Sequence, residues 1–326
     1  MTAENLVEIK DLIKYFPIHS RTASLFGKEL VRAIDGVDLN IGYGETVGLL
    51  GESGCGKTTL GRCVLRLIES TSGRIFFDSR EITSMGPREL RAMRRNMQII
   101  FQDPFSSLDP RMKVGRLVAQ PFDVFPVPNG EDKTERVRFL LEAVGLEAES
   151  AGRFPHEFSG GQRQRIAIAR ALALNPRFIV ADEPVSALDV SIRSQILNLM
   201  RDLKKKFHLT YLYISHDLST VKFICDRVAV MYLGCLSETG PVGQIFRAPL
   251  HPYTRTLIEA VPIPNPFQRK DRQAMKGEPP SPISPPVGCR FHPRCPHTRD
   301  ICREIPPPAV EPDPGHLVYC HLYKAA

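Results

Sequence analysis

Short apolar runs alternate with glycine turns and with amphipathic stretches along most of the chain. Residues 46–50, 178–181 and 211–215 are almost wholly apolar, which predicts strands buried on both faces. Between the last two runs, apolar residues at helical spacing predict an amphipathic helix formed around Ile192, Ile196, Leu199 and Leu203. Its end carries residues 204–206, three lysines that suit a helix C-terminus. Strands that alternate with helices predict an α/β fold with a parallel sheet.

The pattern becomes helical between residues 103 and 158, where we expect a helical subdomain. One apolar helix face there is formed by Val137, Leu140, Leu141 and Val144, and Gly145 suits the position that follows a helix end. Beyond Val261 prolines become frequent, which predicts an extended linker leading to a small tail. With no internal repeat, the chain is expected to comprise one nucleotide domain (1–260) and a Pro-rich, Cys-rich tail (261–326).

The composition is that of a globular protein, with 42% hydrophobic and 24% charged residues in a chain of 326. No apolar run approaches the roughly 20 residues needed to cross a bilayer, and the first residues lack the layout of a secretory signal. We therefore expect a cytosolic protein whose eight cysteines are thiols or metal ligands. The formal charge of +7 is not accompanied by a basic patch with interleaved aromatic residues, so no nucleic-acid partner is expected.

The first apolar run leads into Gly-Glu-Ser-Gly-Cys-Gly-Lys-Thr at residues 51–58, the spacing of a phosphate-binding loop. The glycines let backbone N–H groups face inward around a polyphosphate, and the helix expected near Lys57 adds its positive end. Lys57 would contact the β- and γ-phosphates, and the Thr58 hydroxyl would hold Mg²⁺. We predict a nucleoside triphosphate site that includes Gly51, Ser53, Gly54, Cys55, Gly56, Lys57, Thr58 and Thr59.

Two carboxylates, Asp182 and Glu183, follow the second apolar run at its carboxyl end, where open α/β sheets bind ligands. Asp182 would serve Mg²⁺ through its water shell, and Glu183 would orient or polarise the attacking water. The alternative is a strand that ends in a solvated acidic turn. The phosphate loop in the same chain favours the catalytic interpretation.

A second predicted helix start carries Phe158-Ser159-Gly160-Gly161-Gln162. Ser159 is a good N-cap, and two glycines at the start of a helix allow close backbone approach to an anion. A domain with a complete phosphate loop has little need for another anion site. We interpret residues 159–162 as a surface that meets a phosphate bound to another subunit.

These motifs, in this order, resemble those of the ATP-binding subunits of ABC transporters over about residues 5–260. Residues 51–58 match the Walker A loop, 178–183 the Walker B strand and 158–162 the signature, with Phe158 in place of the usual leucine. The resemblance implies a P-loop NTPase fold, with a RecA-like core, an antiparallel β subdomain and a helical subdomain. A small Cys-rich extension would follow this domain.

The resemblance also implies roles for residues outside the loop. Gln102 matches the Q-loop glutamine that senses the metal and γ-phosphate, and Asp189 lies in the sequence that matches the D-loop. Phe16 falls where an aromatic ring stacks on adenine, with Tyr15 as the alternative. The implied Mg²⁺ ligands are Thr58, Gln102 and Asp182. The implied catalytic group is Lys57, Gln102, Glu183 and the switch histidine His216.

A finer resemblance, to the dipeptide/oligopeptide/nickel importer branch, is carried by residues 101–111, by 251–255 and by the tail from Gly277. The chain looks most like the second, F-type ATPase of a dipeptide system. This implies an ATPase on the cytoplasmic face of the inner membrane that powers peptide uptake through ATP-driven dimer closure. The implied partners are two transmembrane permease subunits, a paralogous ATPase or a second copy of this chain, and, indirectly, an extracytoplasmic solute-binding protein.

The eight cysteines fall into two groups. Those in the nucleotide domain are expected to be small packing residues: Cys55, Cys63, Cys225 and Cys235. The others lie in a tail too poor in apolar residues to form its own core: Cys289, Cys295, Cys302 and Cys320. Their spacing leaves zinc, an iron–sulfur cluster and no metal open, and nearby histidines allow a mixed zinc site (His292, His297, His316 and His321). The resemblance to the peptide-importer branch implies a [4Fe–4S] cluster.

Two other functional classes were weighed. A soluble ABC-type ATPase of translation or DNA repair would carry two nucleotide domains or a long coiled coil, whereas this chain has one signature and no sustained heptads. A P-loop GTPase or kinase would need a base-specific Asn-Lys-x-Asp or a substrate lid, and has no use for residues 159–162. The importer ATPase remains the favoured prediction.

Overall fold

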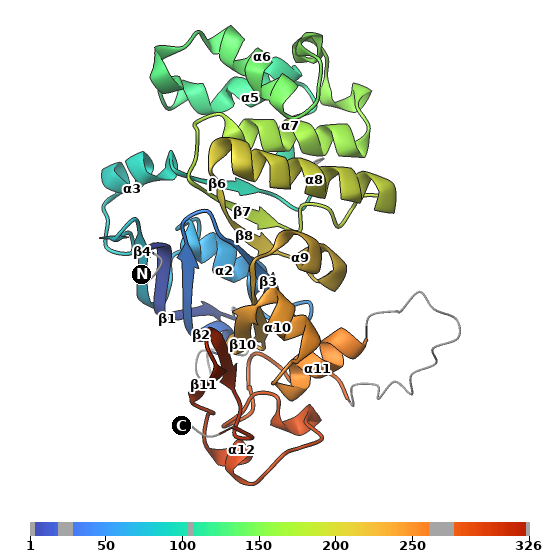
Figure 1. Cartoon of the computed structure of the whole chain (residues 1–326). Coiled ribbons are helices and arrows are strands. Elements are labelled where there is room, and N and C mark those ends of the chain that lie inside the picture. The colour runs from blue at the N-terminus through green and yellow to red at the C-terminus, as the bar shows by residue number, and fades with distance from the viewer. Residues whose placement is uncertain (1–3, 19–28, 104–106, 261–276, 324–326) are drawn as a thin grey trace, which may run out of the picture. The chain divides into compact units, whose positions relative to one another are not determined.

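The computed structural model describes residues 4–18, 29–103, 107–260 and 277–323 (Figure 1). The chain divides into two compact units, each assembled from separate stretches of sequence. Unit 1 consists of Met1–Leu6, Ile41–Thr46 and Ser84–Ile214. Unit 2 consists of Val7–Asn40, Val47–Thr83 and Ser215–Ala326. The predicted linker at residues 261–276 lies outside the described residues.

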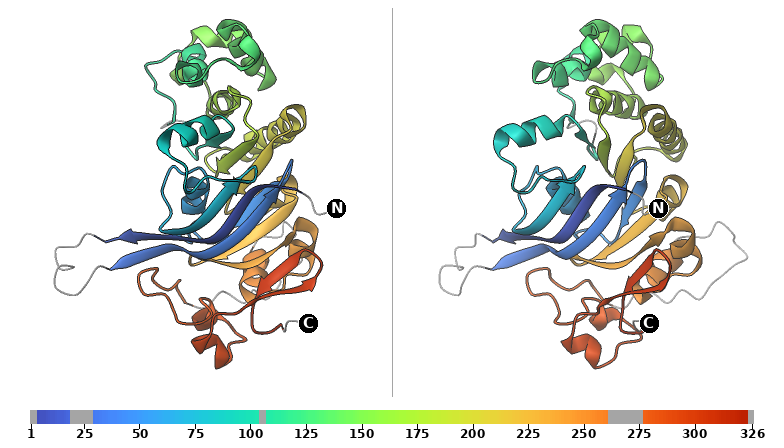
Figure 2. Two further views of the ribbon diagram at one scale, coloured as in Figure 1. Left: turned by 90° about the vertical axis from the view of Figure 1, so that its left-hand side faces the viewer. Right: turned by 60° about the vertical axis from the view of Figure 1, so that its left-hand side comes forward.

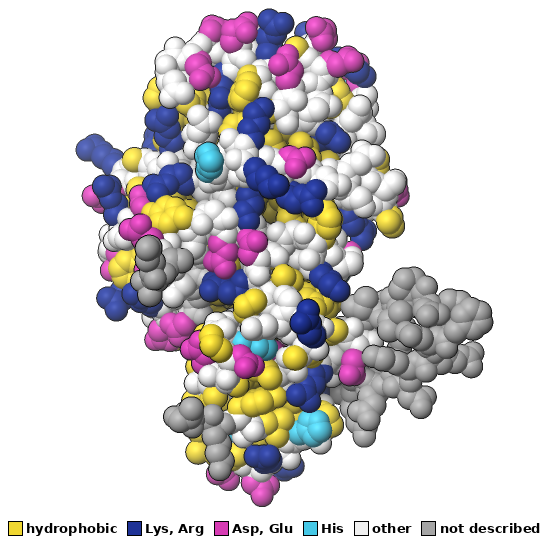
Figure 3. All heavy atoms as spheres, viewed as in Figure 1, with side chains coloured by type: hydrophobic (Ala, Val, Ile, Leu, Met, Phe, Trp, Pro, Cys, Tyr) yellow, Lys and Arg dark blue, Asp and Glu magenta, His cyan; other side chains and the backbone are white. Residues whose placement is uncertain are grey.

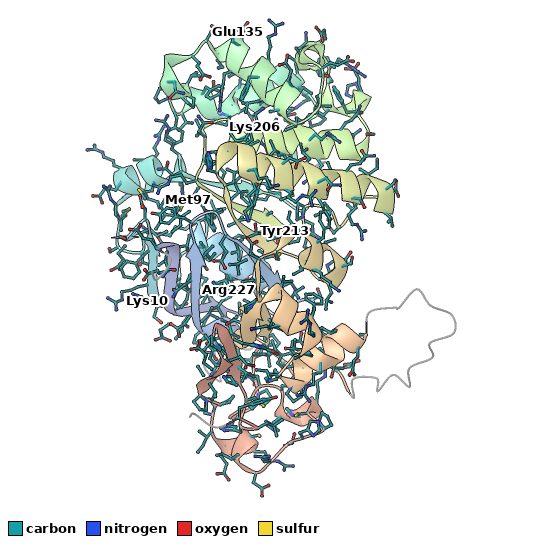
Figure 4. The ribbon with its side chains drawn as sticks, viewed as in Figure 1. Lys10, Met97, Glu135, Lys206, Tyr213 and Arg227 are labelled. Carbon is teal, nitrogen blue, oxygen red and sulfur yellow. The ribbon has the colours of Figure 1, made fainter. Side chains whose placement is uncertain are left out.

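Unit 1 contains a parallel arrangement of β6 (Met97–Ile100), β7 (Phe178–Asp182) and β8 (Thr210–Ile214), with β7 in the middle. Every residue of β7 and β8 is buried, as their apolar sequences predict. Met97 and Tyr213, both labelled in Figure 4, are among the buried side chains of these strands. The parallel pairing confirms the sheet predicted from the alternation of strands and helices.

The helices of unit 1 are α3 (Pro87–Arg94), α5 (Val114–Ala119), α6 (Lys133–Ala143), α7 (Gly160–Leu172) and α8 (Val190–Phe207). Short 3-10 turns lie between them: η1 (Gln120–Asp123), η2 (Pro128–Gly130), η3 (Ala148–Gly152) and η4 (Pro155–Glu157). The predicted face of α6 is buried, and Gly145 follows the helix with a left-handed φ of 73°.

The predicted apolar face of α8 is only partly correct. The side chains that are buried are Ile196, Leu197, Met200 and Leu203, whereas Ile192 and Leu199 are half-buried. Ile192 lies against Gly161 of α7, where an added Cβ would come within 2.4 Å of Ile192 Cγ2. Because α8 packs on α7, the buried face of α8 differs from the face predicted by the spacing of its apolar residues. The lysines at 204–206 do occupy its last turn.

One sheet, most of it in unit 2, has the order β2 (Leu30–Gly42), β1 (Asn5–Pro17), β4 (Ser72–Phe77) and β5 (Arg80–Glu81). β1 pairs with β4 and β4 with β5, in each case antiparallel. Figure 2 shows β1 and β2 as the two long strands of this sheet, each with 13 residues. The sequence pattern predicted only short strands in this region.

The other strands of unit 2 follow the order β3 (Thr46–Leu50), β9 (Arg227–Tyr232), β10 (Cys235–Pro241), β12 (His316–Tyr319) and β11 (Ala309–Asp313). β3 and β9 are parallel, and the remaining pairs are antiparallel. The helices are α2 (Lys57–Val64), α9 (Leu218–Ile224), α10 (Val242–Arg247), α11 (Pro252–Glu259) and α12 (Ile301–Glu304), with the 3-10 turn η5 (His292–Arg294).

The tail shares a core with the nucleotide domain. Its strands β11 and β12 continue the sheet from β10, and Val310, Val318 and Cys320 form a buried cluster that packs on Leu250 and Tyr323. The tail therefore has a small apolar cluster, which was not expected from its sequence, and Leu250 is the residue of this cluster that comes from the nucleotide domain. Hydrophobic side chains also gather on the visible face of the tail in Figure 3. Exposed apolar side chains of the tail include Ile283, Val287, Ile301 and Ile305.

A buried polar pair joins β10 to β12. His316 Nε2 donates to Glu238 Oε1 over 2.7 Å, and the two side chains are 2% and 0% exposed. The same carboxylate accepts the backbone N–H of Leu250 at 2.7 Å and of His251 at 2.9 Å. Glu238 therefore accepts from two buried donors, His316 and His251, and from the part-buried N–H of Leu250.

Of the helices in the described ranges, none combines the length and the apolar character needed to span a bilayer.

Candidate functional site

The predicted phosphate loop connects β3 to α2 in unit 2. Gly51, Gly54 and Gly56 have φ values of 155°, 78° and 108°, a region that L-residues rarely adopt. A Cβ at Gly51 would lie 2.1 Å from the carbonyl oxygen of Met231, and one at Gly56 would lie 2.1 Å from that of Ala33. The backbone therefore requires glycine at both ends of the loop, as the interpretation of the sequence expected.

Lys57 is directed into this loop. Its side chain is buried, and Nζ donates to Gly51 O at 2.8 Å and to Glu52 O at 2.9 Å. Thr58 and Thr59 are half-buried in the first turn of α2, while Ser53 and Gly54 are exposed. An ammonium group, a helix start and exposed loop backbone are the components that bind a polyphosphate.

The buried thiols of the nucleotide domain are packing residues. Cys55, Cys63 and Cys225 are buried, and Cys235 Sγ donates to Asp35 O at 3.2 Å. Burial raises the pKa of Cys63 and of Cys235 to about 11, so both thiols remain protonated at neutral pH. Burial of Cys55, Cys63 and Cys225 agrees with a packing role, whereas Cys235 is of intermediate burial.

The two adenine-stacking candidates differ in their contacts. The Tyr15 hydroxyl donates to Asp35 Oδ1, and burial together with this carboxylate raises the pKa of Tyr15 to about 12. Phe16 is half-buried, with the Lys14 ammonium 4.7 Å from its ring centroid. His216, the predicted switch histidine, is exposed between β8 and α9. Phe16 and Tyr15 remain alternatives.

The predicted catalytic carboxylates lie in unit 1. Asp182 ends β7 and is 3% exposed, and Glu183 follows it with a left-handed φ of 47°. Gln102 Nε2 donates to Glu183 Oε2 at 3.0 Å. Glu183 N donates to Ile214 O at 3.0 Å, which fixes this backbone at the end of β8. A strained backbone held by its surroundings is typical of functional residues.

The predicted signature residues begin α7 of unit 1. Ser159 Oγ accepts from Gln162 N at 3.3 Å, and Gln162 Oε1 accepts from Ser159 N at 3.0 Å, a complete capping box. Ser159 and Gln162 are exposed, whereas Phe158 is buried beneath the Arg153 guanidinium. The start of this helix therefore has the N-cap predicted by the sequence and is accessible to an anion. Asp189, also exposed, immediately precedes α8.

The structure brings Gln102 and Glu183 into direct contact in unit 1, and it places Lys57 in the phosphate loop of unit 2. Sequence reasoning missed two partners of that loop, Tyr253 and Arg294, which both contact Glu52. Tyr253 lies in the 251–255 motif, which indicated the importer branch but no contact with the phosphate loop. Nothing in the local sequence around Arg294 indicated a contact with residue 52.

The four tail cysteines were predicted from the sequence as a candidate metal site. Among the described residues, no group of three or more His, Cys, Asp or Glu side chains is positioned to hold one metal ion. His316 bonds to Glu238, His321 to Ile305 O and His292 to Cys289 O, so these rings have other partners. Burial raises the pKa of Cys289 to about 11, and it also raises the pKa of Cys295 and of Cys320. Neighbouring thiols contribute to all three increases. Metals bind the thiolate form of cysteine, which a raised pKa disfavours.

Comparison with known proteins identifies the family. The ABC transporter family model matches residues 34–186, and the model described as the oligopeptide/dipeptide transporter C-terminal region matches residues 237–302. The oligopeptide transport ATP-binding protein AppF of Bacillus subtilis is 49% identical over 99% of this chain and 100% of its own length. A putative peptide import ATP-binding protein of Brucella ovis is 48% identical over 98% of both chains.

Solved structures agree with this assignment. A dimeric ATP-binding cassette bound to ADP and Pi, 30% identical, covers 72% of this chain and 98% of its own length with a TM-score of 0.63. CbiO1 of Clostridium perfringens, part of an ABC transporter complex, is 28% identical, covers 75% of this chain and 92% of its own length, and has a TM-score of 0.65. The chain therefore belongs to the ABC transporter family, as an ATP-binding protein with the C-terminal region of the oligopeptide/dipeptide transporters.

Proposed function

We propose that this ABC-type ATPase hydrolyses ATP to power the import of dipeptides or oligopeptides through a membrane transporter. The observation that carries the proposal is the phosphate loop of residues 51–58, glycine-dependent at both ends and occupied by a buried lysine. The names of relatives matched over their whole length or nearly so, which describe oligopeptide transport and peptide import, support peptides as the cargo. The alternative of a nucleic-acid or translation ATPase has no support among these relatives.

Each predicted residue receives a role in this proposal. Residues 51–59 bind the phosphates, with Lys57 on the β- and γ-phosphates and Phe16 or Tyr15 on the adenine. Mg²⁺ is held by Thr58, Gln102 and Asp182, hard oxygen donors of the kind that this ion prefers. Glu183 orients or polarises the attacking water, and Gln102, which contacts the Glu183 carboxylate at 3.0 Å, reports the state of the metal and γ-phosphate. His216 acts as the γ-phosphate switch.

We further propose a head-to-tail dimer in which residues 159–162 and Asp189 contact the nucleotide held by the partner subunit. The exposed, capped start of α7 supports this arrangement, because an uncovered helix N-terminus attracts an anion. A solved relative is itself dimeric and bound to ADP and Pi. Loss of the γ-phosphate would remove contacts from both subunits and reopen the pair.

The partner of that dimer is proposed to be a paralogous ATPase, with a second copy of this chain as the alternative. Two transmembrane permease subunits would hold the dimer at the cytoplasmic face of the inner membrane, and a solute-binding protein would act from the other side. We propose residues 1–260 as the ATPase domain, with a helical subdomain at about 103–158, and residues 261–326 as the linker and tail.

Co-expression with two candidate permease subunits and a candidate paralogous ATPase tests the function. We expect the four chains to purify together, and the ATPase activity of the complex in proteoliposomes to rise when a peptide and its solute-binding protein are added. Purification of the chain without membrane proteins, together with ATPase activity stimulated by RNA or DNA and not by peptide, would contradict the importer function.

The four tail thiols are proposed to bind a [4Fe–4S] cluster, with zinc as the alternative. The support is that the pKa of Cys289, raised mainly by burial, is raised further by Cys320, Cys302 and Cys295, so the four thiols lie within electrostatic range of one another. Anaerobic purification should give a protein with iron, sulfide and absorbance near about 400 nm, typical of such clusters. Cys302→Ser should lose the metal and Cys63→Ser should keep it. Metal-free wild-type protein after anaerobic reconstitution with iron and sulfide, and after addition of zinc, would contradict the proposal.

A further inference from the structure

Two arginines of the tail bond to carboxylates beside the nucleotide-binding residues of unit 2. Arg294 contacts Glu52 of the phosphate loop, and Arg290 contacts Asp35, which in turn accepts a hydrogen bond from Tyr15. All five residues belong to unit 2. The two arginines adjoin Cys295 and Cys289 respectively.

The contact at the phosphate end is a bidentate pair. Arg294 Nη1 lies 2.9 Å from Glu52 Oε2, and Nη2 lies 3.2 Å from Oε1. The Arg294 side chain is 6% exposed and that of Glu52 is 24% exposed, so solvent screens this pair less than a surface salt bridge. Two parallel bonds fix the orientation of the carboxylate as well as its position.

Glu52 is also held through its backbone. Its N–H donates to the Tyr253 hydroxyl at 2.9 Å, and its carbonyl accepts from Lys57 Nζ at 2.9 Å. Tyr253 is fully buried, with its ring 4.6 Å from that of Tyr232 and 5.4 Å from that of Phe291 in the tail. The residue that contacts the phosphate-binding lysine is therefore held by groups from α11 and from the tail.

The tail also lines a pocket on the phosphate loop. Residues 278–282 line a pocket of about 490 Å³ together with Glu52, Ser53, Gly54 and Cys55. In the same segment, Pro282 O accepts the backbone N–H of Arg32 at 3.0 Å. The tail thus contacts the loop region through both a side chain and a backbone segment.

The contact at the base end runs through Asp35. Arg290 donates to Asp35 Oδ2 and the Tyr15 hydroxyl donates to Oδ1, and the side chains of Arg290 and Asp35 are 17% and 14% exposed. The Arg32 guanidinium lies over the Tyr15 ring, 5.6 Å from its centroid. Tyr15 is one of the two residues expected to stack on adenine.

We propose that the C-terminal tail sets the nucleotide affinity of this chain, with Arg294 positioning the phosphate loop through Glu52 and Arg290 positioning the base-stacking end through Asp35 and Tyr15. This inference rests on the proposed ATP site of unit 2. Both arginines are positioning residues, because each acts through another side chain and neither is placed on the nucleotide itself.

Nucleotide binding by the full-length chain tests the phosphate-end contact. Arg294→Met should weaken Mg-ATP binding about fivefold or more, within the usual range of coupling between sites, and raise the KM for ATP while kcat at saturating ATP stays close to wild type. Glu52→Gln should have a similar effect, and the double variant should be no weaker than the poorer single variant, because both changes break one pair. Arg294→Lys should recover part of the affinity, because lysine retains the positive charge but cannot form the two parallel hydrogen bonds of the guanidinium group.

Binding of inorganic tripolyphosphate, which lacks the adenine base, distinguishes the phosphate end of the site from the base end. Arg294→Met should weaken binding of both tripolyphosphate and ATP, whereas Arg290→Met should weaken ATP and leave tripolyphosphate unchanged. Arg299→Met is the matched control, because Arg299 is an exposed tail arginine whose side chain bonds to His321 O within the tail. It should bind both ligands as the wild type does.

The outcomes distinguish this inference from the proposed function. A wild-type chain that binds no ATP would refute the proposed ATP site. A wild-type chain that binds ATP, with Arg294→Met and Glu52→Gln variants that melt normally and bind ATP equally well, would refute the positioning role of Arg294. If Arg294→Met does not fold, Glu52→Gln and Arg294→Lys decide the same question, and unchanged affinity in both overturns the inference.

Discussion

Glu183→Gln should bind Mg-ATP with near-normal affinity and hydrolyse it at least about a hundredfold more slowly, the usual contribution of a general base. The amide has nearly the same shape as the carboxylate, and its oxygen can still accept the hydrogen bond from Gln102 Nε2. It cannot accept a proton from the attacking water. Binding and hydrolysis should therefore separate in this variant, which a folding defect would not produce.

ATP turnover by the purified chain and by its complex measures this effect. Glu142→Gln, at an exposed position of α6 in the same unit, is the matched control and should retain wild-type turnover. Near-normal hydrolysis by Glu183→Gln would remove the assigned role from Glu183. Equal loss in both variants would point to a general effect of removing carboxylates.

Glu238→Ala should destabilise unit 2 by about 2–6 kcal/mol, at roughly 1–3 kcal/mol for each of two buried donors left without an acceptor. The two buried donors are the ring of His316 and the backbone N–H of His251, and the substitution also removes the acceptor of the part-buried N–H of Leu250. Water cannot fully replace the lost acceptor for the two buried donors, because His316 and His251 are each no more than 2% exposed. The loss should appear in the unfolding transition of this unit.

Denaturant unfolding, followed by the reactivity of the buried Cys302 and Cys320 thiols, measures that transition. Glu238→Gln should lose less stability, since its amide oxygen keeps one acceptor for these donors. Glu278→Ala changes an exposed carboxylate of the tail and should alter stability by less than about 0.5 kcal/mol, as surface substitutions usually do. Equal midpoints for Glu238→Ala and Glu278→Ala would contradict the role of the buried pair.

The sequence predicted those features whose causes lie within a few residues. Ser159 and Gln162 form a local capping box, and the apolar run before Asp182 is a fully buried strand. The glycines at 51 and 56 are likewise explained by the phosphate-loop pattern and by the φ values that it requires. In each case the chemistry of adjacent residues is sufficient to determine the local structure.

Long-range contacts could not be predicted in this way. Glu238 and His316 are 78 residues apart, and neither has a local pattern that indicates a partner. The buried face of α8 depends on where α7 packs, so Leu197 and Met200 were missed although the helix itself was predicted. Cysteine spacing likewise gives no information on the direction of each thiol, so it left zinc, an iron–sulfur cluster and no metal open for the tail.

The contact between Glu52 and Arg294 spans 242 residues, which has a consequence for the order of events during synthesis. Because a nascent chain emerges from its amino end and folds domain by domain, the phosphate loop leaves the ribosome long before Arg294 exists. Unit 1, most of which is the continuous stretch Ser84–Ile214, is complete while the carboxylate of Glu52 still lacks its guanidinium partner. The phosphate loop therefore acquires its contact with Arg294 only after a further 242 residues have been added to the chain.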